Sequence, residues 1–405
     1  MKAMGPIPAA FAAEDDQLLV GSRTAANLVA EAGGTPLFAY DKAIAGRQVA
    51  RFRAAMPDGV ALHYAVKANP YAPLLTFLAK HVDGFDVASA GELGKVAHLG
   101  LPISFAGPGK RDQELETAIR AGVTINLESE GEADRALAIC EREGLTGRLA
   151  VRVNPPFVLK GAGMKMGGLA SQFGVDHDRA AALIRKIIDA GADWRGLHIF
   201  AGSQVLQPKA LIEAQRETVA LAAQVATQAG TVPPEVNLGG GFGIPYFPGD
   251  EDLDVERVGS ELAETLLGAP DILSETKFAI ELGRWLVGEA GVYLTRIVDR
   301  KESGGRTFLV TDGGLHHILA SSGNFGQLLR RNYPMAIASR FGAKPQEEVT
   351  VTGCLCTPLD LLADQVMLPR AEVGDLVAIF CAGAYGLSAS PQSFLGQPQA
   401  REILV

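Results

Sequence analysis

Eight short apolar segments recur between residues 60 and 285, and this regular recurrence limits the chain to very few folds. The segments expected to form strands are residues 60–67, 85–88, 103–106, 124–127, 149–153, 196–200, 235–238 and 277–280. Apolar residues spaced at i, i+3 and i+4 predict helices between them, at residues 72–81, 114–121, 130–143, 179–190, 210–229 and 254–267. Eight strand–helix units in about 225 residues predict a (β/α)8 TIM barrel. A doubly wound open sheet is the alternative.

The chain changes character after Trp285, where strand patterns follow one another without regular helices between them. The expected strands are residues 286–298, 306–311, 347–352, 364–367 and 375–381. Residues 17–20 also read as a strand, which the N-terminus would add to this all-β domain. The predicted division is therefore an N-terminal segment that joins the β domain (1–35), a barrel (36–284) and a C-terminal β domain (285–405).

Charge and cysteine content narrow the class of protein. The net charge is -9 and no basic cluster stands out, which argues against nucleic acid as the main partner. The four cysteines contain no CxxC pair and form no disulfide framework, so the thiols are expected to be reduced. No segment is apolar for the ~18 residues that a membrane-spanning helix needs. The N-terminus also lacks the apolar core of a secretory signal. We therefore expect a cytoplasmic protein that does not enter a membrane.

A lysine ends the first expected barrel strand, at the edge where barrels carry their chemistry. Lys67 follows a mostly apolar run, so burial or a nearby carboxylate would control its charge. An amine with a lowered pKa is what Schiff-base chemistry needs. A lysine that extends its charged end from the barrel rim into water is the equally simple alternative.

Glycines follow two neighbouring strands and predict an anion site. Gly239, Gly240 and Gly241 form a run at the end of one strand, and Gly202 and Ser203 follow the strand before it. Successive backbone N–H groups in such turns converge on anions, and barrels often hold a phosphate there.

Charged groups near the last barrel strand and in the β domain allow less specific readings. Glu281 and Arg284 follow the last strand, where a local salt bridge is the simpler reading. His316 and His317 are adjacent but have no further ligand at metal spacing, so no metal site is predicted.

Several motifs together resemble the fold type III pyridoxal-phosphate decarboxylases, the family of diaminopimelate, ornithine and biosynthetic arginine decarboxylases. The resemblance covers nearly the whole chain and implies an alanine-racemase-like barrel with a β domain. The matching motifs are YAVKAN at 64–69, GFDVASAGE at 84–92, GSQ at 202–204, GGG at 239–241, ELGR at 281–284, CTPLD at 356–360 and GAYG at 383–386.

The resemblance implies a role for each matched residue and pyridoxal 5'-phosphate as the cofactor. Lys67 would form the Schiff base, Glu281 would face the pyridine nitrogen, and Cys356 would protonate a substrate carbon. The implied cofactor contacts are Asp86, Phe200, Ser203, Gly239, Gly240, Gly241, Gly283, Arg284 and Tyr385. Asp360 and Arg331 would contact the substrate. The Cys356 loop would reach the other subunit, which implies a homodimer with shared active sites.

Departures from the family pattern bear on the substrate. Phe200 stands where the family has a histidine stacked on the cofactor ring, and Gln172 stands where the family has a lysine. Residues 159–168 and 312–334 resemble a narrower branch. That branch contains the butirosin-pathway decarboxylase of carrier-bound glutamate and the decarboxylases of the exosortase A exopolysaccharide system. Phe200 and residues 164–166 favour a substrate bound to an acyl-carrier protein over a free amino acid.

Three other functions are compatible with the same fold. One is diaminopimelate decarboxylase, which makes lysine from free meso-diaminopimelate. A racemase is disfavoured by Glu281 and Cys356, because racemases of this fold place an arginine at the ring nitrogen. A catalytically silent regulator is disfavoured by the presence of the implied cofactor residues Lys67, Ser203, Gly239, Arg284 and Tyr385.

Overall fold

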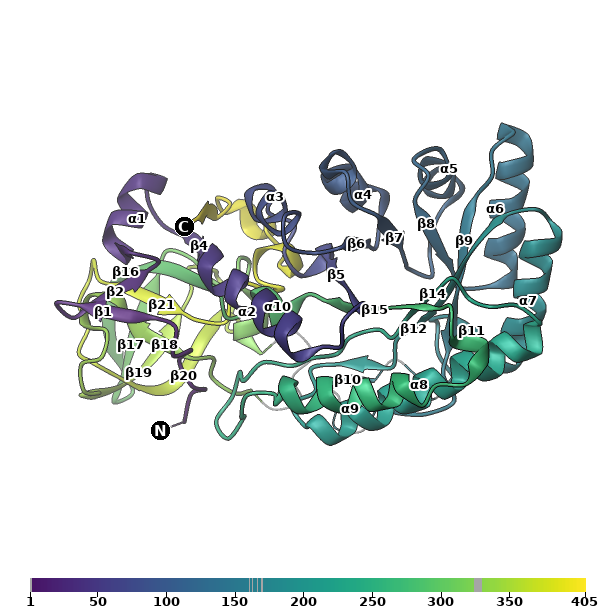
Figure 1. Cartoon of the computed structure of the whole chain (residues 1–405). Coiled ribbons are helices and arrows are strands. Elements are labelled where there is room, and N and C mark those ends of the chain that lie inside the picture. The colour runs from purple at the N-terminus through teal and green to yellow at the C-terminus, as the bar shows by residue number, and fades with distance from the viewer. Residues whose placement is uncertain (1, 160, 162, 166, 169, 324–329) are drawn as a thin grey trace. The chain divides into compact units, whose positions relative to one another are not determined.

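The computed structural model describes residues 2–405 except 160, 162, 166, 169 and 324–329 (Figure 1). The chain forms two units. The barrel unit contains Val49–Gly243 and Asp252–Gly283, and the β unit contains Met1–Gln48, Ile244–Glu251 and Arg284–Val405. Among the described residues, no helix is both long enough and apolar enough to cross a membrane.

The eight predicted barrel strands are confirmed, and they form a closed parallel barrel. They are β5 (Ala61–Ala65), β6 (Gly84–Val87), β7 (Ile103–Phe105), β8 (Thr124–Leu127), β9 (Arg148–Asn154), β12 (Asp193–Ile199), β14 (Glu235–Asn237) and β15 (Lys277–Leu282). Each strand pairs in parallel with the next, and β15 pairs with β5. Closure of the sheet by this last pair rules out the open-sheet alternative.

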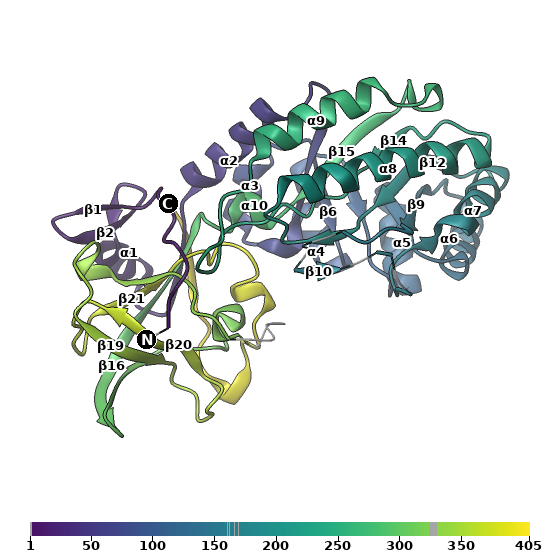
Figure 2. The same cartoon turned by 90° about the horizontal axis from the view of Figure 1, so that it is seen from below.

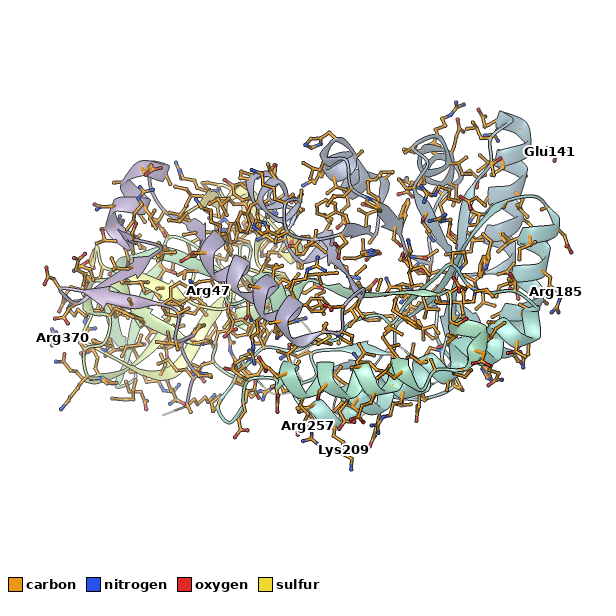
Figure 3. All side chains as sticks on the ribbon, in the orientation of Figure 1. Arg47, Glu141, Arg185, Lys209, Arg257 and Arg370 are labelled. Carbon is orange, nitrogen blue, oxygen red and sulfur yellow. The ribbon has the colours of Figure 1, made fainter. Side chains whose placement is uncertain are left out.

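Helices cover the outside of the barrel, as the apolar spacing predicts. They are α3 (Ala72–Leu78), α4 (Ala90–Val96), α5 (Asp112–Arg120), α6 (Glu130–Glu143), α7 (His177–Asp189), α8 (Pro208–Ala229) and α9 (Val255–Leu267). In α7 the buried residues include Leu183, Ile184 and Ile187, which form one apolar face. Figure 2 shows α8 and α9 side by side. In Figure 3 the labelled charged side chains of α6 to α9 point away from the strands.

Three two-residue strands complete the barrel unit. They are β10 (Met164–Lys165), β11 (Val175–Asp176) and β13 (Gly202–Ser203). β10 pairs with β13, and β11 extends the sheet beside β9.

The β unit is built on one long strand, β16 (Gly291–Ser303). It pairs with β4 (Leu37–Tyr40) and β21 (Leu376–Ile379) along its first half and with β17 (Arg306–Thr311) along its second. The other strands of this sheet are β18 (Met335–Ile337), β19 (Glu347–Thr352), β20 (Leu361–Leu368) and β22 (Arg401–Leu404). The remaining helices of the chain are α1 (Ala25–Ala32), α2 (Lys42–Ala55) and the short α10 (Arg284–Val287).

The structure divides the chain differently from the predicted boundaries at residues 35 and 284. Residues 37–40 form β4, which is fully buried and hydrogen-bonded between β16 and β22, so the β unit extends to Gln48. Residues 17–20 form a strand as expected. This strand, β2, pairs with β1 (Ala12–Glu14) and β3 (Arg23–Thr24) in a separate sheet. Residues 286–287 belong to α10 and not to a strand.

Candidate active site

Lys67 lies just beyond the carboxyl end of β5, in the single 3-10 turn Val66–Ala68. The hydroxyl of Tyr64 donates a 3.0 Å hydrogen bond to the carbonyl oxygen of Asn69, which closes the turn around Lys67. The Lys67 side chain is exposed, and its Nζ lies 5.8 Å from the centroid of the Phe200 ring. The amine is therefore at the catalytic edge of the barrel, beside an aromatic face.

Glu281 carries a buried negative charge at the end of β15. Its Oε2 accepts a 2.8 Å hydrogen bond from Nε2 of His198 and a 3.4 Å bond from Nδ2 of Asn237. Burial raises the pKa of this carboxyl, but the charge and hydrogen bond of His198, helped by Lys67, outweigh burial and bring the pKa to about 2. Glu281 is therefore ionised at neutral pH.

Asp86, on the neighbouring strand β6, has the opposite protonation state. Only 1% of it is exposed, and its Oδ1 has no hydrogen-bond partner. Burial, and next the negative charge of Glu281, raise the pKa of Asp86 well above its ordinary value. One site thus contains a charged and a neutral carboxyl, which is how acid and base roles are separated in enzymes.

The two predicted glycine turns are neighbours. The N–H of Val205 donates to the carbonyl of Gly241, and the N–H of Gly243 donates to the carbonyl of Val205, both at 2.9 Å. Gly239 and Gly241 have φ of +70° and +92°, and a Cβ on Gly240 would overlap the carbonyl oxygen of Glu281. The N–H of Gly239 is donated to Oδ1 of Asn237, while the buried Oγ of Ser203 has no partner.

Three buried polar residues at this edge were missed in the sequence: Arg152, His198 and Asn237. In register, His198 of β12 lies opposite Arg152 on one side and Asn237 on the other. Arg152 donates a 2.9 Å hydrogen bond to Glu128, and its charge lowers the pKa of that carboxyl. The available signal was a polar residue inside an otherwise apolar strand.

Arg284, in the β unit, is surrounded by tyrosines. Its Nη1 donates to the hydroxyl of Tyr246 at 3.1 Å. Its guanidinium carbon lies 5.5 Å and 4.8 Å from the ring centroids of Tyr246 and Tyr385. Burial raises the pKa of Tyr246 to about 12, so this phenol keeps its proton. The aromatic faces fix the guanidinium in place without neutralising its charge.

Asp360 anchors the loop that carries Cys356. Its Oδ1 accepts from the N–H of Leu315 at 2.7 Å, and its Oδ2 accepts from the N–H of Leu355 at 2.8 Å. Cys356 itself is exposed. Burial raises the pKa of nearby Cys354 to about 11, which keeps that residue a thiol. The guanidinium of Arg331 lies 3.7 Å from the Phe247 ring centroid.

Comparison with known proteins identifies the family. The sequence model described as "Pyridoxal-dependent decarboxylase, pyridoxal binding domain" matches residues 43–288, more than half of the chain. The chain belongs to the pyridoxal-dependent decarboxylases. The predicted family, the barrel with its β domain and the lyase class are thereby confirmed.

Two curated relatives and one solved structure show how far the likeness extends. L-glutamyl-[BtrI acyl-carrier protein] decarboxylase of Niallia circulans is 36% identical over 379 residues, covering 91% of this chain and 88% of the relative. Diaminopimelate decarboxylase of Methanothermobacter thermautotrophicus is 33% identical, covering 96% and 90%. The diaminopimelate decarboxylase of M. jannaschii in complex with L-lysine has a TM-score of 0.89 at 25% identity, covering 98% and 93%.

The residues of this decarboxylase fit the cofactor of its family. Three buried polar atoms at the barrel edge have no protein partner: Oδ1 of Asp86, Nδ1 of His198 and Oγ of Ser203. Buried polar atoms are normally paired, so these atoms are suited to a polar ligand. A Cβ on Gly283 would come within 2.7 Å of Ala68, so a side chain there would press on the Lys67 turn. The roles predicted for the individual site residues stay predictions.

Two of the sequence features lie outside the described residues or outside the site of the decarboxylase. Residues 160, 162, 166, 169 and 324–329 are not described, so the predicted importance of residues 164–166 has no structural account. Among the described residues, no group of three or more metal-binding side chains occurs. His317 hydrogen-bonds to the hydroxyl of Tyr293 and to the carbonyl of Pro398, whereas both ring nitrogens of the buried His316 have no partner.

We predict that His316 makes the decarboxylase less stable in acid. Burial, and next His317, lower the pKa of His316 from 6.5 to about 4. The unfolded chain therefore binds a proton between those values that the folded chain does not, so stability falls as pH decreases through this window and levels off below it. The loss is on the order of 1–3 kcal/mol. Thermal melting between pH 7 and 4 should show a shallower pH dependence for His316→Phe.

The exposed His98 provides the control for this measurement. His98→Phe should melt with the wild-type pH dependence. If His316→Phe and the wild type lose stability equally as pH falls, a different group is responsible.

Proposed function

We propose that this decarboxylase acts on an aminoacyl group attached to a carrier protein. The observation that carries the proposal is the pairing of an exposed amine, Lys67, with a buried and ionised carboxylate, Glu281, at one edge of the barrel. The alternative is diaminopimelate decarboxylase, which is supported by relatives with that activity.

Pyridoxal phosphate, when bound, supplies an electron-withdrawing ring that accepts the electron pair left behind by departing carbon dioxide. Lys67 provides the amine that would hold its aldehyde. Glu281 accepts the ring N–H, because an ionised carboxylate there favours a protonated ring. Phe200 offers an apolar face to the ring and forms no hydrogen bond with it.

Other residues orient the cofactor and supply protons. The unpartnered hydroxyl of Ser203 and the turn containing Gly240 and Gly241 are suited to the phosphate. The guanidinium of Arg284 and the hydroxyl of Tyr385 are proposed as further phosphate contacts from the motif match. Cys356 is proposed as the proton donor to the substrate carbon.

We also propose that the chain forms a homodimer with shared active sites. The exposure of Cys356, on a loop fixed by Asp360, supports this arrangement. Asp360 has both oxygens bound to backbone N–H groups, so any contact with substrate would use its remaining lone pairs. The stacking of Arg331 on Phe247 leaves its N–H edge suited to a substrate carboxylate. The four free cysteines support a reducing, cytoplasmic location.

The carrier-bound substrate is supported by the relative that acts on a glutamyl carrier protein, which is similar over 91% of this chain. Phe200 supports it too, since the apolar ring changes the cofactor environment that the family pattern predicts.

Mass spectrometry of products separates the two substrates. The cofactor-loaded chain is given L-glutamyl carrier protein, and separately free glutamate, meso-diaminopimelate, ornithine, lysine and arginine. We expect the glutamyl carrier protein to lose the mass of one carbon dioxide and the free amino acids to stay intact. Lysine formed from meso-diaminopimelate at an ordinary turnover would overturn the carrier-bound proposal. A parallel reaction with Lys67→Ala controls for decarboxylation by free cofactor.

A further inference from the structure

We propose that Asn237 is a positioning residue, which fixes the carboxylate of Glu281 and links it to the glycine turn of the phosphate site. The inference rests on the proposed cofactor site. Asn237 is 4% exposed and ends β14, next to the turn that begins at Gly239.

Asn237 contacts both partners with one side chain. Its Nδ2 donates to Oε2 of Glu281 at 3.4 Å, and its Oδ1 accepts the N–H of Gly239 at 2.8 Å. A side-chain amide has both a donor and an acceptor, whereas a carboxylate only accepts, so asparagine suits this position.

The contact selects one oxygen of Glu281. His198 and Asn237 both donate to Oε2. These bonds hold the plane of the carboxylate and leave Oε1 for a ligand donor such as a pyridine N–H. His198 alone would hold Oε2 at a single point, and the second donor restricts rotation of the carboxylate about its last bond.

The backbone strengthens the link. The N–H of Glu281 donates to the carbonyl of Gly239 at 2.9 Å, and Gly240 packs directly against the carbonyl of Glu281. The turn and the carboxylate are thus tied through both backbone and side chain. Movement of the turn onto a phosphate would therefore move the group that meets the ring nitrogen.

Asn237→Asp separates the two contacts of this side chain. Aspartate keeps the acceptor for Gly239 N–H but replaces the donor with a second negative oxygen, 3.4 Å from Oε2 in the present geometry. Like charges this close disfavour simultaneous ionisation. Asn126→Asp is the matched control, because Asn126 is 2% exposed on β8 of the same barrel and donates to Ser104 at 2.6 Å.

The experiment measures binding to the cofactor-free chain by calorimetry, with pyridoxamine 5'-phosphate and inorganic phosphate as probes. Pyridoxamine 5'-phosphate has the ring and the phosphate but no aldehyde, so Lys67 does not bond to it. We expect Asn237→Asp to weaken its binding at least ~10-fold at pH 8. Phosphate binding should change less than ~2-fold, because the Gly239 contact remains. The loss should shrink at pH 5.5, where one of the two carboxylates takes up a proton.

Asn237→Ser covers the possibility that the aspartate variant does not fold. Serine introduces no charge, and its short hydroxyl can accept from nearby backbone N–H but does not reach Glu281. It should weaken pyridoxamine 5'-phosphate selectively and show no relief at low pH.

Three results would overturn the inference. Unchanged pyridoxamine 5'-phosphate affinity in both Asn237 variants would remove the role. Equal weakening of both probes would indicate general damage to the turn, and an equal loss in Asn126→Asp would indicate a general effect of buried charge. If the wild type binds neither pyridoxamine 5'-phosphate nor pyridoxal phosphate, the proposed cofactor site itself is wrong, and this inference fails with it.

Discussion

Replacing Lys67 with alanine is expected to reduce kcat at least ~10³-fold, because the variant loses the amine that would hold the cofactor aldehyde. The purified variant should also lose the visible absorbance of covalently held cofactor. Fold and stability should change little, since the Lys67 side chain is exposed. The measurement is a steady-state rate together with an absorbance spectrum of the protein after dialysis.

Lys80→Ala is the control, because Lys80 is also exposed, just after α3. A Lys67→Ala protein that keeps its spectrum and its rate would contradict the proposed cofactor attachment. Mixing inactive Lys67→Ala with Cys356→Ala should restore about a quarter of the wild-type rate if each active site takes one residue from each subunit. No recovery would remove the shared-site proposal.

Glu281→Gln is expected to lower kcat ~10²-fold or more while the cofactor stays attached. Glutamine is nearly isosteric but lacks the charge that favours a protonated ring. The pKa of Glu281 is about 2, below the ordinary 4.5, so this group is charged at every pH above 2 and loses its charge only as pH falls through that value. We therefore expect that any fall in wild-type rate between pH 8 and 5 is still present in the glutamine variant.

Glu264→Gln, on the exposed side of α9, is the control for loss of one negative charge. If Glu281→Gln keeps the wild-type kcat, Glu281 does not control the ring. Asp86→Asn should cost less than Glu281→Gln, because Asp86 is already neutral at working pH.

The barrel could be predicted from sequence because each parallel strand is buried on both faces and appears as a short apolar run. Residues 124–127 and 306–311 form strands over the predicted ranges. The domain boundary could not be predicted in the same way. Residues 37–40 are as apolar as a barrel strand, and only pairing with β16 and β22, far away in sequence, assigns them to the β unit.

The candidate site divides along the same line. Lys67 and Glu281 lie in distinctive local motifs, so sequence was enough to single them out. His198 and Asn237 each appear as one polar residue in an apolar strand, which is also how a satisfied core residue appears. Their relation to Glu281 depends on the register of three strands, and register between distant strands is not encoded in any local pattern.

The route of the chain has a consequence for dissecting this enzyme. The backbone passes between the two units four times, at residues 48/49, 243/244, 251/252 and 283/284. No single proteolytic cut can release either unit whole, and a gene truncated after residue 283 would encode β4 without β16 and β22. Such a fragment would expose an apolar strand with both edges unpaired, a common cause of insoluble inclusion bodies. Loss of either unit during evolution would therefore require several coordinated deletions.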